Sequence, residues 1–320
     1  MPRVSVVIPT YNRTDFVRPA ILSVLNQTYQ DFEIIVVDDG TTKNTSDLIT
    51  ALHSKKIKYI RHEYNKGEAE TRNTGILNSN GQYIAFLDDD DEWFSEKLKL
   101  QVNKIENSPQ QIGLIYTGLL GCHYRENKLL YQWQYIPLHK GNTYYTLMKK
   151  NFIYTPSSVL IRRRCMEQIG LFNPEIAYGL DYDYWIRISE QFDFEYLAEP
   201  LVKYRLHENG LSNNNELKVQ GAQDLAMKYG KQITANNYWR SIYLHLGIEL
   251  CRKGEMKKGI YALSRSIRYY PTQKRSRFYF DISMLSLINF KWTLVLKNKL
   301  RPYFLNRRLR KLFLGGDDFL

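Results

Sequence analysis

Four consecutive aspartates, Asp88 to Asp91, are the residues of this sequence best suited to chemistry. They follow residues 83–87, an apolar and aromatic run that is typical of a short buried strand. In open α/β sheets, ligands bind beyond the C-terminal ends of the strands. Adjacent carboxylates repel one another, and a hard divalent cation with oxygen ligands relieves that repulsion. The pattern favours a site for Mn²⁺ or Mg²⁺; a solvated acidic turn is the alternative for this segment taken alone.

Acidic residues also stand at two other places where a ligand could be bound. Asp38 and Asp39 directly follow the apolar run 32–37, and the end of such a strand is where doubly wound sheets bind nucleotides. A lone Asp-Asp-Gly would indicate an ordinary strand-ending turn, but a second acidic site favours a binding role. Asp181 and Asp183 begin a predicted helix, where negative charge is favourable.

The elements that must position these carboxylates alternate between strands and short helices. Strands are predicted at residues 4–8, 32–37, 57–61, 83–87, 112–117 and 157–161, and helices at 14–25, 46–52, 72–78, 97–106 and 181–190. This alternation predicts an α/β protein with a Rossmann-like, mostly parallel central sheet and flanking helices.

The charge of the chain changes sign near residue 215. Residues 1–216 contain 24 Lys and Arg against 27 Asp and Glu, a net charge of −3, whereas residues 217–320 contain 21 against 6, a net charge of +15. We therefore predict a catalytic domain at 1–212 and a basic helical extension at 213–320. Three scattered cysteines argue against a disulfide framework or a zinc site. No signal peptide or spanning segment is apparent, so we expect a cytoplasmic protein.

Seven segments together resemble glycosyltransferase family 2, a family of nucleotide-sugar-dependent transferases with the GT-A fold. In the family's order they are residues 4–13, 32–40, 65–73, 81–93, 156–162 and 181–187, and Tyr204-Arg205 with His207. Each motif alone is a weak signal, but their order along the chain is highly specific.

The resemblance implies that a metal ion bridges the diphosphate of the donor and neutralises charge as the glycosidic bond breaks. The family's D-x-D element matches Asp88-Asp89-Asp90. By resemblance Asp90 is the direct metal ligand, Asp88 and Asp89 contribute to the nucleotide-sugar site, and His207 is a second ligand near the diphosphate. Spacing alone does not decide which carboxylate touches the ion, because every D-x-D register is available within the four aspartates.

The resemblance also implies how the nucleotide is bound. The carboxylate at Asp39 contacts the base, which favours UDP, while Thr10 and Tyr11 cover the nucleoside. Arg72 would lie near the negative charge of the nucleotide, with a solvated helix arginine as the alternative. Trp93 could stack on a sugar or base, but an aromatic residue of this kind is more often part of the core.

Inversion at the anomeric carbon requires a base that removes the proton of the acceptor hydroxyl. The family carries a Glu-Asp pair before an aromatic-rich helix, with the Asp as base. Here the pair is Leu180-Asp181, so the base is present and the preceding Glu is replaced. A Leu neighbour would raise the pKa of Asp181 by desolvation. A helix N-cap is the alternative role for Asp181.

We expect a metal-dependent inverting glycosyltransferase whose acceptor is a saccharide or a lipid-linked glycan, and no nucleic-acid partner. One alternative is a nucleotidyltransferase, but residues 6–13 lack the glycine-rich phosphate loop that such an enzyme needs. A second alternative is a catalytically degenerate GT-A domain that acts as a glycan-binding or scaffold subunit. Residues 284–314 mix apolar and basic side chains, and we expect them to attach the protein peripherally to an anionic membrane; a helical cap is the alternative.

Overall fold

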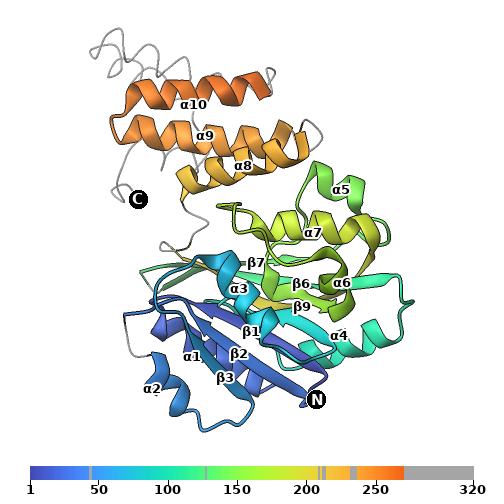
Figure 1. Ribbon diagram of the computed structural model, residues 1–320. Helices are drawn as coiled ribbons and strands as arrows, with labels where there is room; N and C mark the ends of the chain where they lie inside the picture. The colour runs from blue at the N-terminus through green and yellow to red at the C-terminus, as the bar shows by residue number, and fades with distance from the viewer. Residues whose placement is uncertain (43–44, 127, 208–209, 211–213, 231–235, 270–320) are drawn as a thin grey trace. The chain divides into compact units, whose positions relative to one another are not determined.

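The computed structural model describes residues 1–42, 45–126, 128–207, 210, 214–230 and 236–269. The chain divides into two compact units, Met1–Ala235 and Asn236–Leu320, and Figure 1 shows the elements of each. The site described below belongs entirely to the first unit.

The described strands of the first unit form one nine-stranded sheet in the order β3-β2-β1-β4-β8-β6-β9-β5, with β7 paired to β6. The strands are β1 (Val4–Thr10), β2 (Phe32–Asp38), β3 (Ile57–Arg61), β4 (Tyr83–Phe86), β5 (Glu92–Trp93), β6 (Ile112–Arg125), β7 (Lys128–Tyr135), β8 (Val159–Arg162) and β9 (Asp193–Leu206). Strands β3, β2, β1 and β4 run parallel, whereas β8 is antiparallel to both β4 and β6. The sheet is therefore parallel over the segment that carries the first two acidic sites and mixed beyond it.

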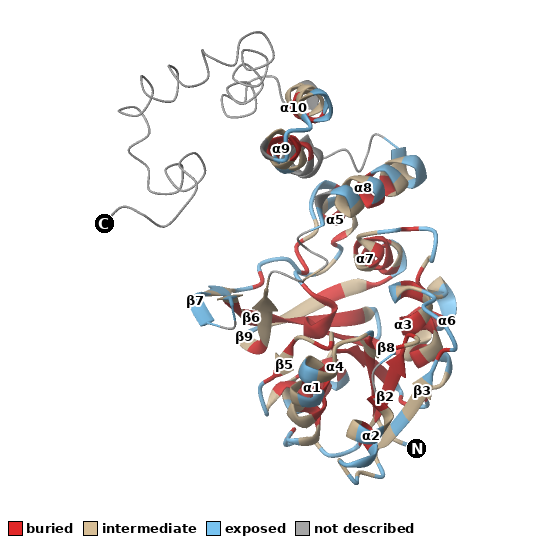
Figure 2. Cartoon of the chain, turned by 90° about the vertical axis from the view of Figure 1, so that its left-hand side faces the viewer, coloured by how far each residue is buried: buried red, intermediate tan, exposed pale blue. Residues whose placement is uncertain are grey.

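Helices cover both faces of this sheet. They are α1 (Thr14–Leu25), α2 (Thr45–Thr50), α3 (Glu68–Leu77), α4 (Lys97–Glu106), α5 (Tyr144–Lys149), α6 (Arg163–Ile169), α7 (Leu180–Gln191) and α8 (Asn215–Tyr229), with a 3-10 turn, η1 (Pro156–Ser158). Alternate residues of a strand face opposite sides: in β1, Val6 joins the core under α1 and α4, while Val7 joins the core under α3 and α7. Figure 2 shows the buried strands between the outer helices.

Most predicted elements of the first 106 residues are present, with bounds that differ by a few residues. Strand β9 was not predicted, because its sequence holds charged residues and Pro200 and shows no regular alternation of polar and apolar residues. Strand β7 was not predicted either, since it lies exposed beside β6. Both strands prove important for the site.

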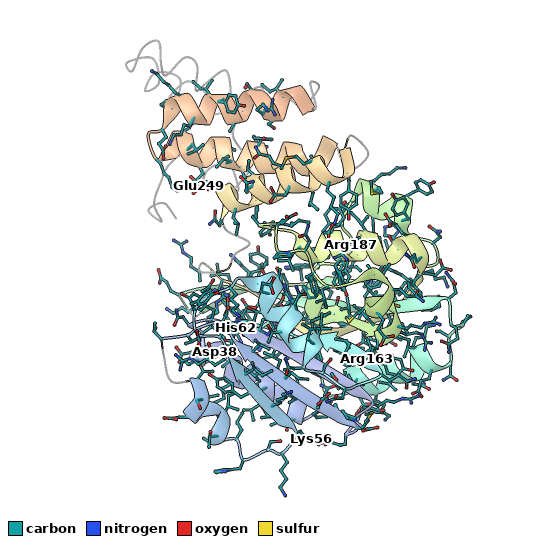
Figure 3. The ribbon with its side chains drawn as sticks, viewed as in Figure 1. Asp38, Lys56, His62, Arg163, Arg187 and Glu249 are labelled. Carbon is teal, nitrogen blue, oxygen red and sulfur yellow. The ribbon has the colours of Figure 1, made fainter. Side chains whose placement is uncertain are left out.

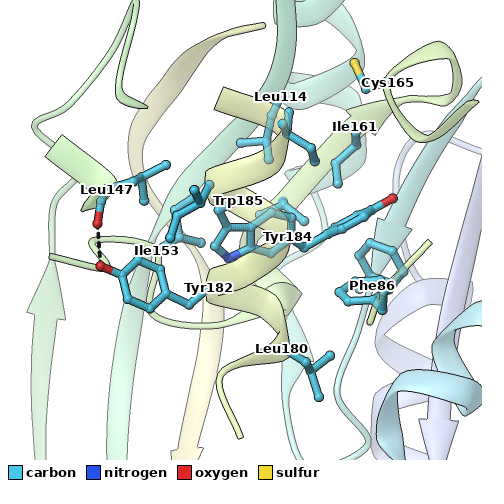
Figure 4. Packing of buried hydrophobic residues seen from close by; sticks show 14 of the residues in the cluster. Phe86, Leu114, Leu147, Ile153, Ile161, Cys165, Leu180, Tyr182, Tyr184 and Trp185 are labelled. Carbon is cyan, nitrogen blue, oxygen red and sulfur yellow. Dashed lines mark hydrogen bonds between the residues drawn. The ribbon is translucent and has the colours of Figure 1, made fainter. Parts of the chain in front are cut away.

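Helix α7 carries the predicted base, and its core packing fixes its position. Trp185 and Tyr184 are fully buried between the sheet and the neighbouring helices, as Figure 4 shows. The hydroxyl of Tyr182 donates to the backbone carbonyl of Leu147 at the end of α5. Leu180, which replaces the family's Glu, is 4% exposed and belongs to the same core. Position 180 is thus a packing position in this chain.

Helix α8 is part of the first unit, although the sequence grouped it with the extension. The Asp183 carboxylate, fully buried on α7, accepts hydrogen bonds from Lys228 Nζ and Tyr229 Oη of α8, each at 2.6 Å. Gly221 lies so close to the Tyr178 carbonyl that a Cβ would stand 2.1 Å from the oxygen. These contacts explain the assignment, because they hold α8 against the segment that leads into α7.

In the second unit, α9 (Asn236–Arg252) and α10 (Met256–Tyr269) form a helical pair interrupted at Gly254, within the segment that the sequence predicts to be helical. Gly247 and Gly259 let the helices approach closely, since a Cβ at either position would lie about 3.0 Å from the other's carbonyl oxygen. Among the described residues, none of the helices is both long and apolar enough to cross a membrane. The predicted membrane-binding segment 284–314 lies outside the described residues.

Candidate active site

The four aspartates after β4 alternate between two environments. The side chains of Asp88 and Asp90 are 25% and 17% exposed, while that of Asp89 is 6% exposed and Asp91 is buried. The spacing of the four aspartates left every D-x-D register open, but their burial separates them. Asp88 and Asp90 are the two of the four carboxylates that a ligand can reach.

Asp89 and Asp90 are both tied to the first strand and the loop after it. Thr10 Oγ1, at the end of β1, donates to Asp89 Oδ2 at 2.8 Å. Arg13 Nη1 reaches Asp89 Oδ1 at 3.2 Å and Asp90 Oδ2 at 2.9 Å. Burial, followed by the charge of Asp90, raises the pKa of Asp89 to about 7. Arg13 therefore offsets the repulsion between the two carboxylates. Tyr11, which follows Thr10 and is also predicted to cover the nucleoside, is 46% exposed.

His207 lies against Asp90, although the two residues are 117 positions apart; their role as metal ligands stays a prediction. The distance from His207 Nε2 to Asp90 Oδ2 is 3.0 Å, and the imidazole stacks on Phe16 of α1, with ring centroids 4.9 Å apart. The stacking and the position of His207 just after β9 hold the ring beside the acidic cluster. The site is thus formed by the ends of β1, β4 and β9.

The Asp90–His207 pair suits a divalent cation. The 3.0 Å between His207 Nε2 and Asp90 Oδ2 is a hydrogen-bond distance, and the pair offers a cation one imidazole nitrogen and one carboxylate oxygen. Within the described residues, no three His, Cys, Asp or Glu side chains are grouped to hold a metal by themselves. Phosphate oxygens of a substrate would complete such a site, as is common for Mg²⁺.

Asp91 serves as the internal anchor of the cluster. Its Oδ2 accepts hydrogen bonds from Ser157 Oγ at 2.6 Å and Thr155 Oγ1 at 3.1 Å, and its Oδ1 accepts one from the Arg205 N–H at 3.0 Å. Burial, with the charges of Asp90 and Asp88, raises the pKa of Asp91 well above its ordinary value. One carboxylate thus joins β4, η1 and β9.

Arg72 links the acidic cluster to the predicted base. Its guanidinium is 1% exposed and contacts Asp88 Oδ1 at 2.6 Å and Glu68 Oε1 at 2.5 Å. The guanidinium also acts electrostatically on Asp181. Arg72 therefore lies among carboxylates inside the protein and not in the solvated position that was the alternative. Its place near the negative charge of the nucleotide stays a prediction.

Asp181 lies in the first turn of α7, partly exposed. Burial raises the pKa of its carboxyl to about 6, while the positive charge of Arg72 lowers it and the negative charges of Glu68 and Asp88 raise it. A carboxyl with this pKa is mostly ionised at neutral pH and more basic than an ordinary aspartate, the balance that a general base requires.

Asp39 is held within the protein by several partners. Its Oδ1 accepts hydrogen bonds from His62 Nδ1 at 2.7 Å and the Lys66 N–H at 2.8 Å, and its Oδ2 accepts one from the Gly67 N–H at 2.9 Å. Gly67 has φ of 90°, which favours glycine at this turn before α3. Figure 3 shows His62 close to the end of β2, where Asp38 is labelled. Asp39 thus organises the loop beside the strand ends.

Several residues of the site were not singled out from the sequence. Arg13 and Ser157 were visible only as parts of larger matching segments, and Thr155 lies outside those segments, because a single hydroxyl or guanidinium carries no spacing signal of its own. Trp93, offered as a possible stacking residue, is 5% exposed in the core, and its indole N–H donates to the Ser157 carbonyl.

Comparison with known proteins places these features in a family. The family model described as glycosyl transferase family 2 matches residues 5–170. An uncharacterized glycosyltransferase of Rickettsia felis is 33% identical over 222 residues, which is 67% of this chain and 36% of that protein. This chain thus spans about a third of that relative's length. The Escherichia coli protein WfgD, named UDP-Glc:alpha-D-GlcNAc-diphosphoundecaprenol beta-1,3-glucosyltransferase, is 29% identical over 248 residues, 77% of this chain and 94% of WfgD.

A solved structure of another protein is similar to this chain in fold. The mannosyltransferase PcManGT from Pyrobaculum calidifontis, in complex with GDP-Man and Mn²⁺, matches with a TM-score of 0.53 and 16% identity, over 98% of this chain and 88% of that chain. At this identity the likeness concerns the fold alone. It confirms the predicted GT-A fold.

Proposed function

Because this chain belongs to glycosyl transferase family 2, we propose that it transfers a sugar from a nucleotide diphosphate donor to a saccharide or lipid-linked acceptor, with inversion at the anomeric carbon. The observation that carries the proposal is the position of Arg72. Its guanidinium forms an ion pair with Asp88 of the acidic cluster, and its charge also acts on Asp181, whose pKa is raised. A donor-binding group and a base thus lie in one electrostatic cluster, as a displacement at one carbon requires.

The donor diphosphate would lie against the exposed carboxylates, with Asp90 and His207 as the protein ligands of Mn²⁺ or Mg²⁺. When bound, such an ion stabilises negative charge on the leaving diphosphate. Arg13, paired with Asp89 and Asp90, offsets part of the repulsion between these two carboxylates in the absence of donor. Asp88, held by Arg72 and by Thr155 Oγ1, is oriented before the donor arrives.

Asp181 would remove the proton of the acceptor hydroxyl while that oxygen attacks the anomeric carbon. Its helix is fixed by the core packing of α7, so the carboxylate needs little reorganisation. Arg72 favours the ionised form of Asp181 before the reaction and is an unsuitable proton donor, because guanidinium stays charged in proteins.

The alternative is a non-enzymatic glycan-binding or scaffold subunit, and Leu180 is the feature that favours it. Its burial among the core residues of α7 weakens that argument, because Leu180 serves the packing of the helix while the neighbouring Asp181 stays partly exposed. Both acidic sites and the base candidate are present, so we keep the enzyme as the conclusion.

A donor screen tests the function. The full chain is incubated with UDP-, GDP- and dTDP-sugars, with Mn²⁺ or Mg²⁺, and release of nucleoside diphosphate is measured. We expect release from a UDP-sugar, in line with the donor in the name of WfgD, and loss of that release in excess EDTA. If no donor releases its nucleotide while the chain still binds glycans, the scaffold alternative is correct.

We propose that Asp39 takes part in reading the base, both directly and by holding the Lys66–Gly67 loop through two hydrogen bonds, with a third hydrogen bond to His62. Replacing Asp39 by Ala leaves these donors without their acceptor, at a cost of ~1–3 kcal/mol. We therefore expect KM for the donor to rise about tenfold or more and the preference for UDP over GDP to weaken. The ratio of kcat/KM for the two donors measures this, with the melting temperature as a check on folding. An unchanged UDP preference would assign base recognition to other residues.

We further propose that the acceptor is linked to a lipid, and the name of WfgD supports this by homology. The proposal that residues 284–314 bring the enzyme to an anionic membrane surface rests on their sequence.

A further inference from the structure

An aromatic cluster lies on the β6–β7 side of the site and has no role in the function argued so far. The rings of Trp133 and Tyr154 have centroids 5.4 Å apart, and those of Tyr135 and Tyr154 lie 4.5 Å apart. Tyr154 is 48% exposed and Trp133 is partly exposed. The indole N–H of Trp133 has no hydrogen-bond acceptor among the described residues. Figure 2 shows that β7, which carries Trp133, lies exposed at the edge of the sheet.

The sheet connects this cluster to the acidic site. Trp133 of β7 is paired with Gly121 of β6, and Gly121 is paired with Tyr204 of β9. Directly paired residues point to the same face of a sheet. A Cβ at position 121 would stand 2.2 Å from Trp133 Cε2, so the glycine lets the indole lie across β6 toward Tyr204.

Two further observations place the cluster next to the reacting groups. Burial, followed by the charge of Asp91, raises the pKa of Tyr204 well above its ordinary value, which shows that Tyr204 borders the acidic cluster. Tyr154 directly precedes Thr155, whose hydroxyl donates to Asp88 Oδ2 at 3.2 Å. The aromatic cluster thus lies on segments that also border the carboxylates.

The chemistry of this surface suits a sugar ring. The face of an aromatic ring is electron-rich, and it attracts the polarised C–H bonds that a pyranose with equatorial hydroxyls presents on each face. Tyr and Trp combine such a face with a polar tip, and here the free indole N–H could donate to a ring hydroxyl. Trp93 and Trp185 are buried in the core and leave no such face.

We infer that Trp133 and Tyr154 form a subsite for a glucose-type or N-acetylglucosamine-type pyranose of the acceptor, on the β7 side of the acidic cluster. The inference rests on the proposed function, since it assigns the ring to the acceptor rather than to the donor.

Saturation-transfer NMR with cellobiose and N,N′-diacetylchitobiose as probes tests the subsite on the full chain in the presence of UDP and Mn²⁺. We expect transfer to the C–H protons of one of these sugars in the wild type. Trp133→Ala and Tyr154→Ala should weaken binding about tenfold, a typical effect of losing one aromatic contact, while Trp133→Phe should retain part of it. Tyr145→Ala is the matched control, because Tyr145 is 75% exposed on α5 outside the cluster.

Two measurements separate the possible outcomes. The melting temperature and the affinity for UDP show whether each variant is folded. If Trp133→Ala does not fold, Tyr154→Ala tests the subsite in its place. Loss of sugar binding in a folded variant supports the subsite. Equal binding in wild type and both Ala variants, or no binding to either probe, overturns it. Failure of the donor screen with intact, Trp133-dependent sugar binding would instead refute the transferase while keeping the glycan site.

Discussion

Replacing Asp181 by Asn should lower kcat by about 10²–10⁴-fold, the usual contribution of a general base, while KM for the donor changes little. Asn has the size of Asp and no basic oxygen, so the helix keeps its packing and the acceptor hydroxyl loses its proton acceptor. Steady-state kinetics with a saturating donor measure this, because a loss that falls on kcat alone marks an interaction made in the transition state.

The pH dependence provides an independent readout for the same residue. Burial raises the pKa of Asp181 to about 6, so the carboxylate is progressively protonated as the pH falls below this value. In the wild type, we expect kcat to be constant above about pH 7 and to fall tenfold per pH unit below about pH 5. The Asn variant should lack this acidic limb, because no group remains at position 181 to titrate.

Asp15→Asn is the control for a purely structural effect. Asp15 and Asp181 are each the second residue of their helix, so both variants lose the same interaction with a helix N-terminus, worth about 0.3–1 kcal/mol. Asp15 is exposed, and we expect its variant to retain full kcat. If Asp181→Asn keeps kcat and loses donor binding, Asp181 is a donor-binding residue and another group is the base.

The sequence predicted those parts of the site that lie on strands with an unmistakable pattern. Strands such as 32–37 are buried on both faces, so their apolar run is continuous and ends where the acidic residues begin. The acidic residues at 38–39 and 88–91 could therefore be located from the chain alone. Their individual tasks could not, because the alternation of Asp88 and Asp90 with Asp89 and Asp91 depends on partners from three distant segments.

Strand β9 illustrates why the remainder was out of reach. Its partner β6 begins 81 positions earlier and pairs with it in parallel through several irregularities, so neither strand carries a local signal for the other. Yet this pairing brings Tyr204 beside the acidic cluster and leads His207 to Asp90. Only the resemblance, which concerns order along the chain rather than local pattern, indicated that this segment belongs to the site.

Replacing Asp90 by Asn should reduce turnover by about 10³-fold or more and abolish the metal-dependent part of UDP binding. The variant removes the negative charge that Asp90 offers opposite His207, and the loss of metal stabilisation of a leaving group costs several kcal/mol, where each 1.4 kcal/mol is about tenfold in rate. Titration calorimetry with UDP, with and without Mn²⁺, measures the binding part. Turnover with the preferred donor measures the rest.

The stability of the Asp90 variant should remain close to that of the wild type, since Asp90 is partly exposed and such ion pairs contribute about 0–1 kcal/mol. A loss of activity at an unchanged melting temperature therefore reports on the site and not on folding. Asp31→Asn, the same substitution at an exposed position before β2, controls for the loss of one negative charge. Full wild-type turnover in excess EDTA would remove the metal from the mechanism, and Asp90 would then act on the donor through Arg13, whose guanidinium already lies 2.9 Å from its carboxylate.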